Sequence, residues 1–275
     1  MKMPRIMNDI NELQNEYKEA VASPDTFYKA ELLKRNGAVI DKDGAKKTIS
    51  DVIVSFMEND NPLLKVKQIT NKLPYIINHS GKRAASTRNS NRLEELTAMA
   101  LFNRTIYEGS DIDYVVDYQV PIERTKEKTS GIGKIDLIAV SHTKRKIYLM
   151  ELKRHSNVQE SLLRCAAECY TYYMQIDKLL LAKQVANCEK LKADMEKCND
   201  PANISAIEYY EIIPAVLVFE NQRQHMQYES KHFENVQGLM KSLNISMFII
   251  KAPQGYRDKD YDKLIQKCTV LDITK

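Results

Sequence analysis

The chain has 275 residues, of which 43% are hydrophobic and 28% are charged, a composition typical of globular proteins that excludes a disordered or fibrous chain. No run approaches the roughly 18 consecutive apolar residues of a membrane span, and Met1–Ile10 lacks the apolar stretch of a signal peptide. We therefore expect a cytoplasmic protein without a membrane partner. The net charge of +4 permits a polyanionic partner without requiring one.

The first part of the chain, residues 5–80, is predicted to be mostly helical, with amphipathic spacing at Ile10–Leu13 and Ile49–Met57. The segment His79–Asn91 is polar, basic and poor in apolar residues, which predicts a linker or loop. The sequence thus predicts an N-terminal helical region over residues 1–85 and a second domain over residues 86–275.

The second domain shows helical and strand patterns in alternation. Strands are predicted where β-branched and aromatic residues gather, and helices where apolar residues recur every three or four positions. The predicted order is helix 91–104, strand 114–121, strand 134–140, strand 146–152, helix 158–182, strand 212–219, helix 233–243, strand 245–251 and helix 261–268. The αβββαβαβ order that precedes the last helix indicates an α/β fold.

The cysteines and histidines show no metal-binding pattern. The five cysteines are odd in number and lack CxxC spacing, so we expect reduced thiols rather than disulfides or a zinc ribbon. Cys165 and Cys169 lie one helical turn apart and suit a shared metal, but buried free thiols are the favoured interpretation. The five histidines form neither HxH nor HExxH, which argues against a zinc hydrolase.

Three charged residues lie on the two consecutive strands that a short turn joins. Asp136 is near the start of one strand, while Glu151 and Lys153 are at the end of the next, two residues apart and therefore on one face. The apolar run before Glu151 predicts burial, and buried carboxylates require compensation. Mg²⁺ or Mn²⁺ held by Asp136, Glu151 and the carbonyl of Leu152 supplies it, because hard cations prefer oxygen ligands.

The third side chain of this group suits a different task. The ammonium of Lys153 beside a metal orients the attacking water and offsets charge on a phosphate, so the set predicts phosphodiester hydrolysis. The alternative is a surface salt bridge between Glu151 and Lys153, which carries no chemistry.

The segments Gly133–Ile138 and Tyr148–Arg154 resemble the core of the PD-(D/E)XK nuclease superfamily, which includes restriction endonucleases, Holliday-junction resolvases and RecB-type nucleases. The resemblance covers about residues 90–220. It implies a restriction-endonuclease-like αβββαβ core with a mixed sheet flanked by helices. It also implies that Asp136 and Glu151 are metal ligands, that Lys153 is the catalytic lysine, and that the protein is a Mg²⁺- or Mn²⁺-dependent endonuclease or exonuclease.

Relatives often place a further acidic residue on the helix before the first strand. At 100° per residue, Glu95 falls on the side of Met99 and Phe102, whereas Glu94 falls on the polar side. A carboxylate on an apolar face is unusual, and a metal contact explains it. We therefore predict Glu95 as the fourth catalytic and metal-binding residue.

The helix after the strands departs from the pattern of the RecB-like branch, which often has Gln followed four residues later by Tyr. Arg164, Glu168 and Tyr172 have the spacing and the tyrosine, but the glutamine is missing. Glu168 and Arg164 are predicted on the face opposite the apolar stripe, where a solvated ion pair is the favoured interpretation.

Basic residues near these motifs are predicted to contact nucleic-acid phosphates, with DNA favoured over RNA. They are Lys82, Arg83, Arg88, Lys144, Arg145 and Arg154. One alternative is a catalytically silent nucleic-acid-binding or interaction module on the same fold. Another is a defence nuclease whose N-terminal region recognises a partner or target. The sequence leaves the oligomeric state open, with a dimer as one option.

Overall fold

The structure is a computed structural model that describes residues 10–40, 44–70, 73–81, 92–123, 133–156, 159–200, 202–257 and 260–274. Its N-terminal region contains α1 (Ile10–Ala20), η1 (Pro24–Lys29), α2 (Glu31–Lys34), β1 (Ala38–Ile40), β2 (Lys46–Thr48), α3 (Ile49–Met57) and η2 (Pro62–Lys65). The helices predicted around Ile10 and at Ile49–Met57 are confirmed. The antiparallel pair of β1 and β2 was not predicted.

The rest of the chain alternates helices and strands. In order these are α4 (Leu93–Phe102), β3 (Tyr114–Pro121), β4 (Lys134–Ser141), β5 (Lys146–Leu152), α5 (Leu162–Gln175), α6 (Lys178–Ala186), α7 (Glu189–Lys197), η4 (Ile204–Tyr209), β6 (Glu211–Phe219), α8 (Arg223–Glu229), η5 (Lys231–Phe233), α9 (Glu234–Ser242), β7 (Ser246–Lys251), α10 (Tyr261–Gln266) and β8 (Thr269–Asp272). The five strands predicted in this part are confirmed within about one residue.

Six strands form one sheet in the order β3-β4-β5-β6-β7-β8. The pairs β5-β6 and β6-β7 are parallel, and the other three are antiparallel, so the sheet is mixed as expected. Parallel pairing of β5 and β6 requires a long crossover, which α5, α6 and α7 provide. The α/β class is therefore confirmed, with helices on both faces of the sheet.

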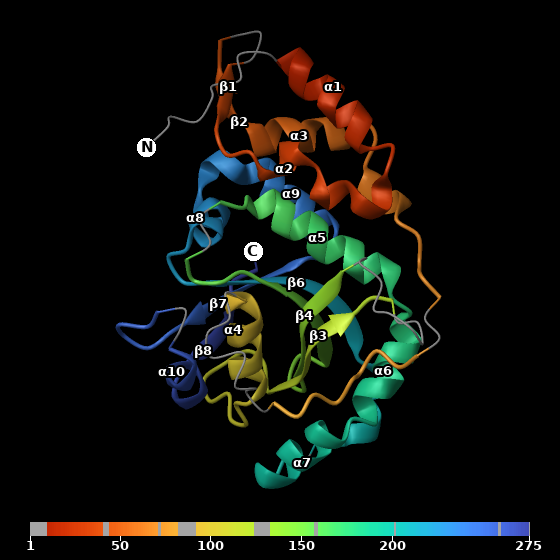
Figure 1. The fold of residues 1–275 in the computed structure, drawn as a ribbon, viewed down its shortest axis with the longest axis vertical. Helices are drawn as coiled ribbons and strands as arrows, with labels where there is room; N and C mark the ends of the chain where they lie inside the picture. Colours follow the sequence, from red (N-terminus) through yellow and green to blue (C-terminus); the bar gives the residue numbers. More distant parts are fainter. Residues whose placement is uncertain are drawn as a thin grey trace.

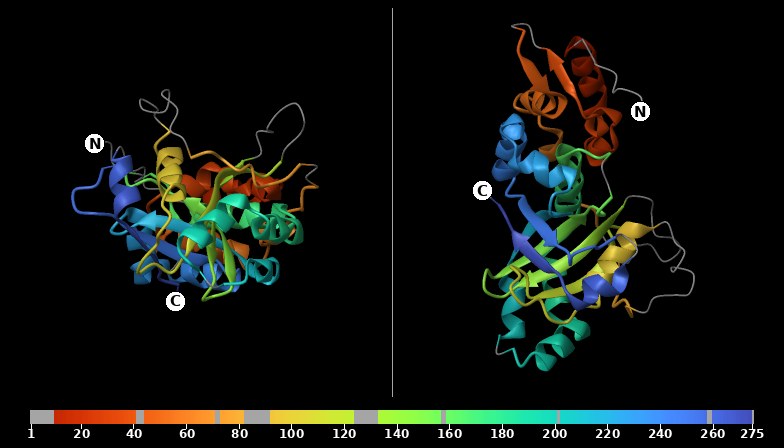
Figure 2. Two further views of the ribbon diagram at one scale, coloured as in Figure 1. Left: turned by 90° about the horizontal axis from the view of Figure 1, so that it is seen from below. Right: turned by 90° about the vertical axis from the view of Figure 1, so that its left-hand side faces the viewer.

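The two faces of the sheet bury separate hydrophobic clusters. Alternate residues of β5 show the division, since Ile147 and Leu149 join the cluster under α5, while Tyr148 and Met150 join the cluster under α4 and α10. Helices α5, α8 and α9 lie between the sheet and the N-terminal region (Figures 1 and 2). The sheet is therefore covered by one layer of helices on one side and two layers on the other.

The N-terminal region shares the cluster under α5 rather than forming a core of its own. Leu13, Phe27 and Ile53 belong to the same buried cluster as Leu149. Asp117 on β3, which is fully buried, accepts hydrogen bonds from the backbone of residues 77 and 78 at 2.7 and 3.2 Å. The two parts predicted as 1–85 and 86–275 thus pack as one body, and the predicted boundary near residue 85 lies outside the described residues.

One predicted helix differs from the structure, and one strand of the six-stranded sheet was not predicted. The helix predicted over 158–182 ends at Gln175, and a second helix begins where the Asp177 side chain accepts from the amide of Leu180 at 3.0 Å. The continuous apolar periodicity hid this break, because a capping aspartate does not interrupt it. The chain also returns to the sheet after α10 as β8, a short edge strand that was not predicted.

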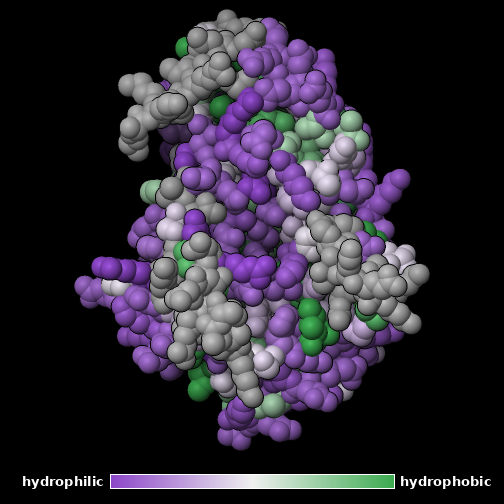
Figure 3. Space-filling view, in the orientation of Figure 1, coloured by the Kyte–Doolittle hydropathy of each residue, from purple (hydrophilic) through white to green (hydrophobic). Residues whose placement is uncertain are grey.

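Other expectations concern the thiols and the surface. All five cysteines are free, and Cys165 and Cys169 are buried, as predicted. Among the described residues, no helix combines the length and apolar character that crossing a bilayer requires. The face in Figure 3 is mostly hydrophilic where it is described, with only small apolar patches.

Candidate functional site

The β4-β5 hairpin places the predicted acidic residues side by side. Leu137 pairs with Met150, and continuing that antiparallel register sets Asp136 beside Glu151. The amide of Leu152 donates to Asp136 Oδ2 at 2.9 Å, which links the start of β4 to the end of β5. The end of β5 is fixed in turn by β6, because the Lys153 amide donates to the Leu217 carbonyl at 3.0 Å.

Asp136 is held from the other side by the neighbouring strand. Gln119 of β3 donates from Nε2 to Asp136 Oδ1 at 2.6 Å. Gln119 has a positive φ of 50°, a conformation that non-glycine residues adopt rarely, and it lies beyond the irregularity at Val115–Asp117. Both carboxylate oxygens of Asp136 therefore have a protein donor.

Lys153 is 3% exposed and contacts three carboxylates. Its Nζ lies 2.5 Å from Glu151 Oε1, 2.9 Å from Glu160 Oε2 and 3.4 Å from Glu168 Oε2. Glu160 lies just before α5 and Glu168 is inside it, so α5 and the segment that leads into it supply two of the three carboxylates. Glu160 and Arg164 also form an ion pair.

Burial dominates the acid–base behaviour of the two strand carboxylates. It raises the pKa of Asp136 to about 7, against the opposing charge of Lys153. Burial and the charges of Asp136 and Glu168 raise the pKa of Glu151 well above its usual range. Burial also opposes the charge on Lys153, but Glu151 and Glu168 outweigh it and raise the pKa of the ammonium. Lys153 is therefore a cation at neutral pH.

The cluster carries more negative than positive charge when every group is ionised. Asp136, Glu151, Glu160 and Glu168 are opposed by Lys153 and Arg164, which leaves two negative charges. Glu151 is 5% exposed and Asp136 is 8% exposed, so water screens little of this repulsion. Two protons or one divalent cation restore neutrality.

A cleft of about 600 Å³ opens beside Asp136. Its walls come from the start of α4, from β3 and β4, and from the segment after β5. The lining residues are Arg92, Leu93, Glu94, Glu95, Gln119, Lys134, Asp136, Arg154, Ser156, Gln159 and Glu160. Three of them are cationic: Arg92 precedes α4 as its N-cap, Lys134 begins β4, and Arg154 lies two residues after β5.

Both glutamates of the first turn of α4 line this cleft. Glu95, the predicted fourth member, is half-buried and forms an ion pair with Arg92 at 2.8 Å. The charge of Glu94, however, contributes to the raised pKa of Asp136, so this neighbour interacts with the acidic pair. The assignment of Glu95 stays a prediction, and Glu94 joins it as an equal candidate by position.

The predicted phosphate-binding residues do not lie together. Arg154 lines the cleft. Lys144 and Arg145 lie in the β4-β5 turn, at the opposite end of the hairpin from Asp136 and Glu151, so they do not flank the acidic pair as their sequence position suggested. At 3.3 Å per residue, strands of this length separate the two ends by roughly 20 Å. Lys82, Arg83 and Arg88 lie outside the described residues.

The expectation of a solvated Arg164–Glu168 pair is wrong. The Glu168 side chain is 12% exposed, and it contacts Lys153 and accepts from the Tyr172 hydroxyl at 3.0 Å. Burial opposes its ionisation, but Lys153, Arg164 and hydrogen bonds from Glu151 and Tyr172 lower its pKa. Helical phase alone placed Glu168 toward solvent, because it took no account of the charged end of β5 beneath α5.

The residues at the acidic pair fit a hard divalent cation in their chemistry. Asp136 and Glu151 are buried in a cluster that has an excess of two negative charges, which one Mg²⁺ ion would neutralise. Proteins usually bind Mg²⁺ through one or two carboxylates. In the described part of the chain, no three His, Cys, Asp or Glu residues are grouped to hold a metal. The ligand set of Asp136, Glu151, Leu152 and Glu95 therefore stays a prediction.

Sequence reasoning missed several residues of the site. Gln119, Glu160 and Lys134 line the cleft or contact its charged groups, but no motif marks them. The position of Gln119 depends on an irregular strand, and that of Glu160 depends on where α5 begins. The only local pattern that marks the start of α5 is its N-cap residue Ser161, whose hydroxyl accepts from the Arg164 amide at 3.1 Å.

Comparison of the chain with models of protein families, with curated proteins and with solved structures finds no match.

Proposed function

We propose that this protein is a metal-dependent nuclease that hydrolyses phosphodiester bonds, built on a restriction-endonuclease-like αβββαβ core. The observation that carries the proposal is the buried pair of Asp136 and Glu151, which is short of positive charge and lies beside a buried lysine and a cleft. A purely structural cluster gains nothing from excess buried charge, because each uncompensated carboxylate destabilises the fold.

The cation is proposed to bind between the strand ends. Asp136, Glu151 and the carbonyl of Leu152 would hold it, with Glu95 or Glu94 of α4 as a further contact. A bound Mg²⁺ or Mn²⁺ supplies an acidified water and polarises a phosphate oxygen. The side chain of Gln119 holds one carboxylate oxygen of Asp136, and the backbone amide of Leu152 holds the other.

Lys153 serves in this proposal as a cation rather than as a base. Its raised pKa keeps the ammonium protonated, so it donates hydrogen bonds and does not accept a proton from water. Directed at the phosphate, an ammonium in a site that excludes water stabilises the charge that develops on the oxygens. Glu160 and Glu168 hold that ammonium in place from the α5 side.

The substrate is proposed to enter along the cleft. Arg92, Lys134 and Arg154 line it together with Asp136, and cations at these positions suit the phosphates that flank the scissile bond. DNA is proposed before RNA because the motif resembles that of restriction endonucleases and resolvases. The basic residues expected at 82–88 belong to the same proposal.

One experiment tests the proposal directly. Purified protein is incubated with plasmid DNA, linear DNA, single-stranded DNA and RNA, with Mg²⁺, with Mn²⁺ and with a chelator, beside the variant Lys153→Ala. We expect cleavage that requires the cation and is lost in the variant. Cleavage that persists in chelator or in the variant contradicts the mechanism. Binding without cleavage of any substrate favours the silent binding module instead.

A further inference from the structure

Residues 28–36 of the N-terminal region contact the beginning of α5 directly. The contacts are three hydrogen bonds to or from the backbone: Asn36 Nδ2 to the Gln159 carbonyl at 2.7 Å, Ser161 Oγ to the Leu33 carbonyl at 2.6 Å, and Arg164 Nε to the Tyr28 carbonyl at 3.3 Å. These bonds fix the part of the chain from which Glu160 and Arg164 project. The N-terminal region therefore supports the helix that supplies carboxylates to Lys153.

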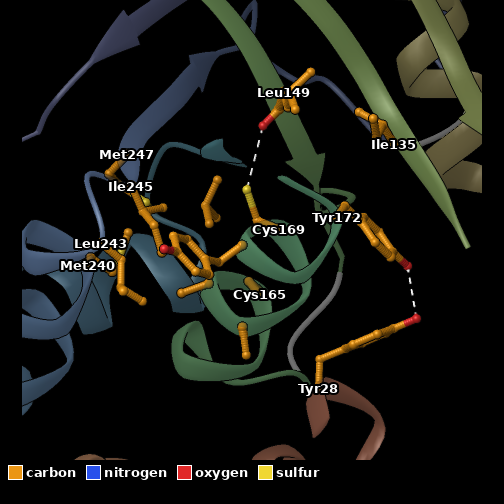
Figure 4. Packing of buried hydrophobic residues seen from close by; sticks show 14 of the residues in the cluster. Tyr28, Ile135, Leu149, Cys165, Cys169, Tyr172, Met240, Leu243, Ile245 and Met247 are labelled. Carbon is orange, nitrogen blue, oxygen red and sulfur yellow. Dashed lines mark hydrogen bonds between the residues drawn. The ribbon is translucent and has the colours of Figure 1, made fainter. Parts of the chain in front are cut away.

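A chain of side chains continues this contact to the lysine. The hydroxyl of Tyr28 lies 3.2 Å from that of Tyr172 (Figure 4). The hydroxyl of Tyr172 in turn lies 3.0 Å from Glu168 Oε1. Glu168 Oε2 lies 3.4 Å from Lys153 Nζ. Tyr28 and Tyr172 are 2% and 5% exposed, so water does not replace either partner readily. Four side chains thus connect η1 to the ammonium of the proposed site.

The roles of the two hydroxyls follow from the carboxylate. Glu168 accepts hydrogen bonds, and a tyrosine hydroxyl has one proton, so the proton of Tyr172 is directed to Glu168. Because that proton is committed to Glu168, and because each hydroxyl can donate or accept, we assign the 3.2 Å contact between the two hydroxyls as one in which Tyr28 donates to the oxygen of Tyr172. Without the Tyr28 hydroxyl, Tyr172 has one fewer fixed contact and its hydroxyl is freer to turn from Glu168.

Close packing sets the position of Tyr172 as well. A Cβ on Gly133, which has φ +141° and lies just before β4, would be 2.5 Å from the Tyr172 hydroxyl oxygen. The rings of Tyr28 and Tyr172 meet edge to face at 5.5 Å between centroids. The hydroxyl of Tyr172 therefore lies between the N-terminal region on one side and the start of β4, three residues before Asp136, on the other.

We propose that Tyr28 is a positioning residue of the site. Through Tyr172 it orients Glu168, and Glu168 then holds the Lys153 ammonium at the end of β5. The N-terminal region is thus part of the catalytic structure, and its contact with α5 is needed for full turnover. This inference rests on the proposed nuclease function for its kinetic consequence, but the geometry of Lys153 is measured separately.

The test compares Tyr28→Phe with Tyr17→Phe. Tyr17 is a matched control, because it is also buried in the N-terminal region and its hydroxyl also donates a hydrogen bond, to the carbonyl of Asp60 at 2.5 Å. Neither change removes a ring. For both variants we measure kcat and KM for DNA cleavage with saturating Mn²⁺, and melting temperature on the same samples.

A second measurement reports on Lys153 without using activity. In protein labelled with ¹⁵N-lysine, a buried ammonium held by carboxylates exchanges slowly enough to give its own ¹H–¹⁵N signal, and the signal lost in Lys153→Met is that of Lys153. Tyr172→Phe and the double variant Tyr28→Phe/Tyr172→Phe complete the set. If Tyr28 acts only through Tyr172, the effects of the two substitutions are not additive, because the two side chains belong to one hydrogen-bonded series.

We expect Tyr28→Phe to lower kcat about tenfold with KM within about twofold, because a small misplacement of a catalytic group is costly. Its Lys153 signal should shift or broaden, and the double variant should match Tyr172→Phe. Tyr17→Phe should change neither kcat nor the signal. If Tyr28→Phe behaves like Tyr17→Phe in both measurements, the inference is wrong. If wild-type protein cleaves nothing, the nuclease proposal fails, and the signal alone decides the positioning role.

Discussion

The β4-β5 hairpin has a turn end, at residues 142–145, and a site end, where Asp136, Glu151 and Lys153 lie. Both ends place a lysine among carboxylates, but the two ends differ in burial and in charge. At the turn end, Lys144 contacts Asp111 at 3.0 Å and Asp272 at 2.9 Å, and the Lys144 and Asp111 side chains are about one third exposed. At the site end, the Lys153 side chain is 4% exposed among three carboxylates, with Asp136 next to Glu151. Only the site end combines a buried lysine with an excess of two carboxylates.

The pKa values of Asp272 at the turn end and of Asp136 at the site end shift in opposite directions. Burial works against the ionisation of Asp272, but hydrogen bonds from Thr274 and Lys144 outweigh it and lower its pKa. At the site end, burial outweighs every favourable contact and raises the pKa of Asp136 to about 7. A lysine surrounded by acids is therefore no sign of function by itself. A functional site is indicated instead by a buried carboxylate whose negative charge the neighbouring protein groups do not neutralise.

The largest predicted effect separates the ends by activity. Asp136→Asn should lower the rate of Mn²⁺-dependent DNA cleavage roughly a thousandfold, because the cation site supplies several kcal/mol of transition-state stabilisation. The matched change at the turn end, Asp272→Asn, removes a contact of Lys144. It should leave the rate within about twofold. Equal losses in both variants, measured under the same conditions, would remove the functional distinction between the two ends.

The next test uses one glycine near each end of the β4-β5 hairpin. Gly133→Ala, near the site end, places a methyl group 2.5 Å from the Tyr172 hydroxyl oxygen and requires φ +141°. Gly109→Ala lies two residues before Asp111 at the turn end, where the added methyl group has no neighbour within 4 Å and the backbone has φ +70°. Strain alone should cost each variant about 1 to 3 kcal/mol in the free energy of unfolding. Denaturant unfolding and cleavage rates are compared for both.

The difference between these variants lies in activity. We expect Gly133→Ala to lose cleavage about tenfold or more beyond its stability loss, because displacing Tyr172 disturbs Glu168. Gly109→Ala should cleave at the wild-type rate once it is folded. Should Gly133→Ala retain full turnover, the tight contact at Tyr172 does not support the site.

The pH dependence of stability should have opposite signs at the two ends. Asp136 has a folded pKa near 7, above the usual value for aspartate, so its contribution is complete at low pH and is lost as pH rises through 7. In chelator, the melting temperature of wild type should fall between pH 5 and pH 8 by roughly 5 °C more than that of Asp136→Asn. Mg²⁺ or Mn²⁺ should reverse the fall in wild type only.

Asp272 provides the contrast. Its folded pKa is lowered, so it stabilises the protein above the usual aspartate range, and this contribution is lost as pH falls through its folded pKa. Asp272→Asn should therefore lower the melting temperature at pH 7 and little at pH 3, with no response to divalent cations. Scanning calorimetry of wild type, Asp136→Asn and Asp272→Asn from pH 3 to pH 8 measures both pH dependences. Parallel curves for the two variants would contradict the assignment of buried excess charge to the site end.

The sequence predicted the strands and the acidic pair well because both depend on local patterns. The apolar run of β5 and the spacing of Glu151 and Lys153 are visible in a few residues, and the short turn at residues 142–145 makes the hairpin. From these alone, Asp136 was expected beside Glu151, and the structure places it there. Local reasoning is sufficient where one strand pairs with the next.

The contacts from elsewhere in the chain were not predictable in this way. Glu168 reaches Lys153 because α5 crosses the end of β5, and Tyr28 reaches Tyr172 across 144 positions of sequence. Lys144 was expected near the site because it follows Asp136 closely in sequence, yet the hairpin carries it to the far end. Sequence proximity to a motif is therefore a poor guide to its surroundings where a strand intervenes.

The smallest predicted effect concerns DNA affinity. Arg154 lines the cleft, whereas Lys144 is occupied by two aspartates at the far end of the hairpin. Arg154→Gln should weaken DNA binding several-fold and reduce the slope of log affinity against log salt by about one, because one phosphate contact is lost. Lys144→Gln should change neither.

Binding is measured by fluorescence anisotropy with the cleavage-deficient Lys153→Ala protein as the common background, so that hydrolysis does not disturb the titration. Both variants remove one positive charge, and a general electrostatic attraction would weaken binding equally in each. A difference between them therefore reports position, and it assigns the phosphate path to the end of the hairpin where Asp136 and Glu151 lie. Equal weakening would place the DNA on a surface that the cleft does not define.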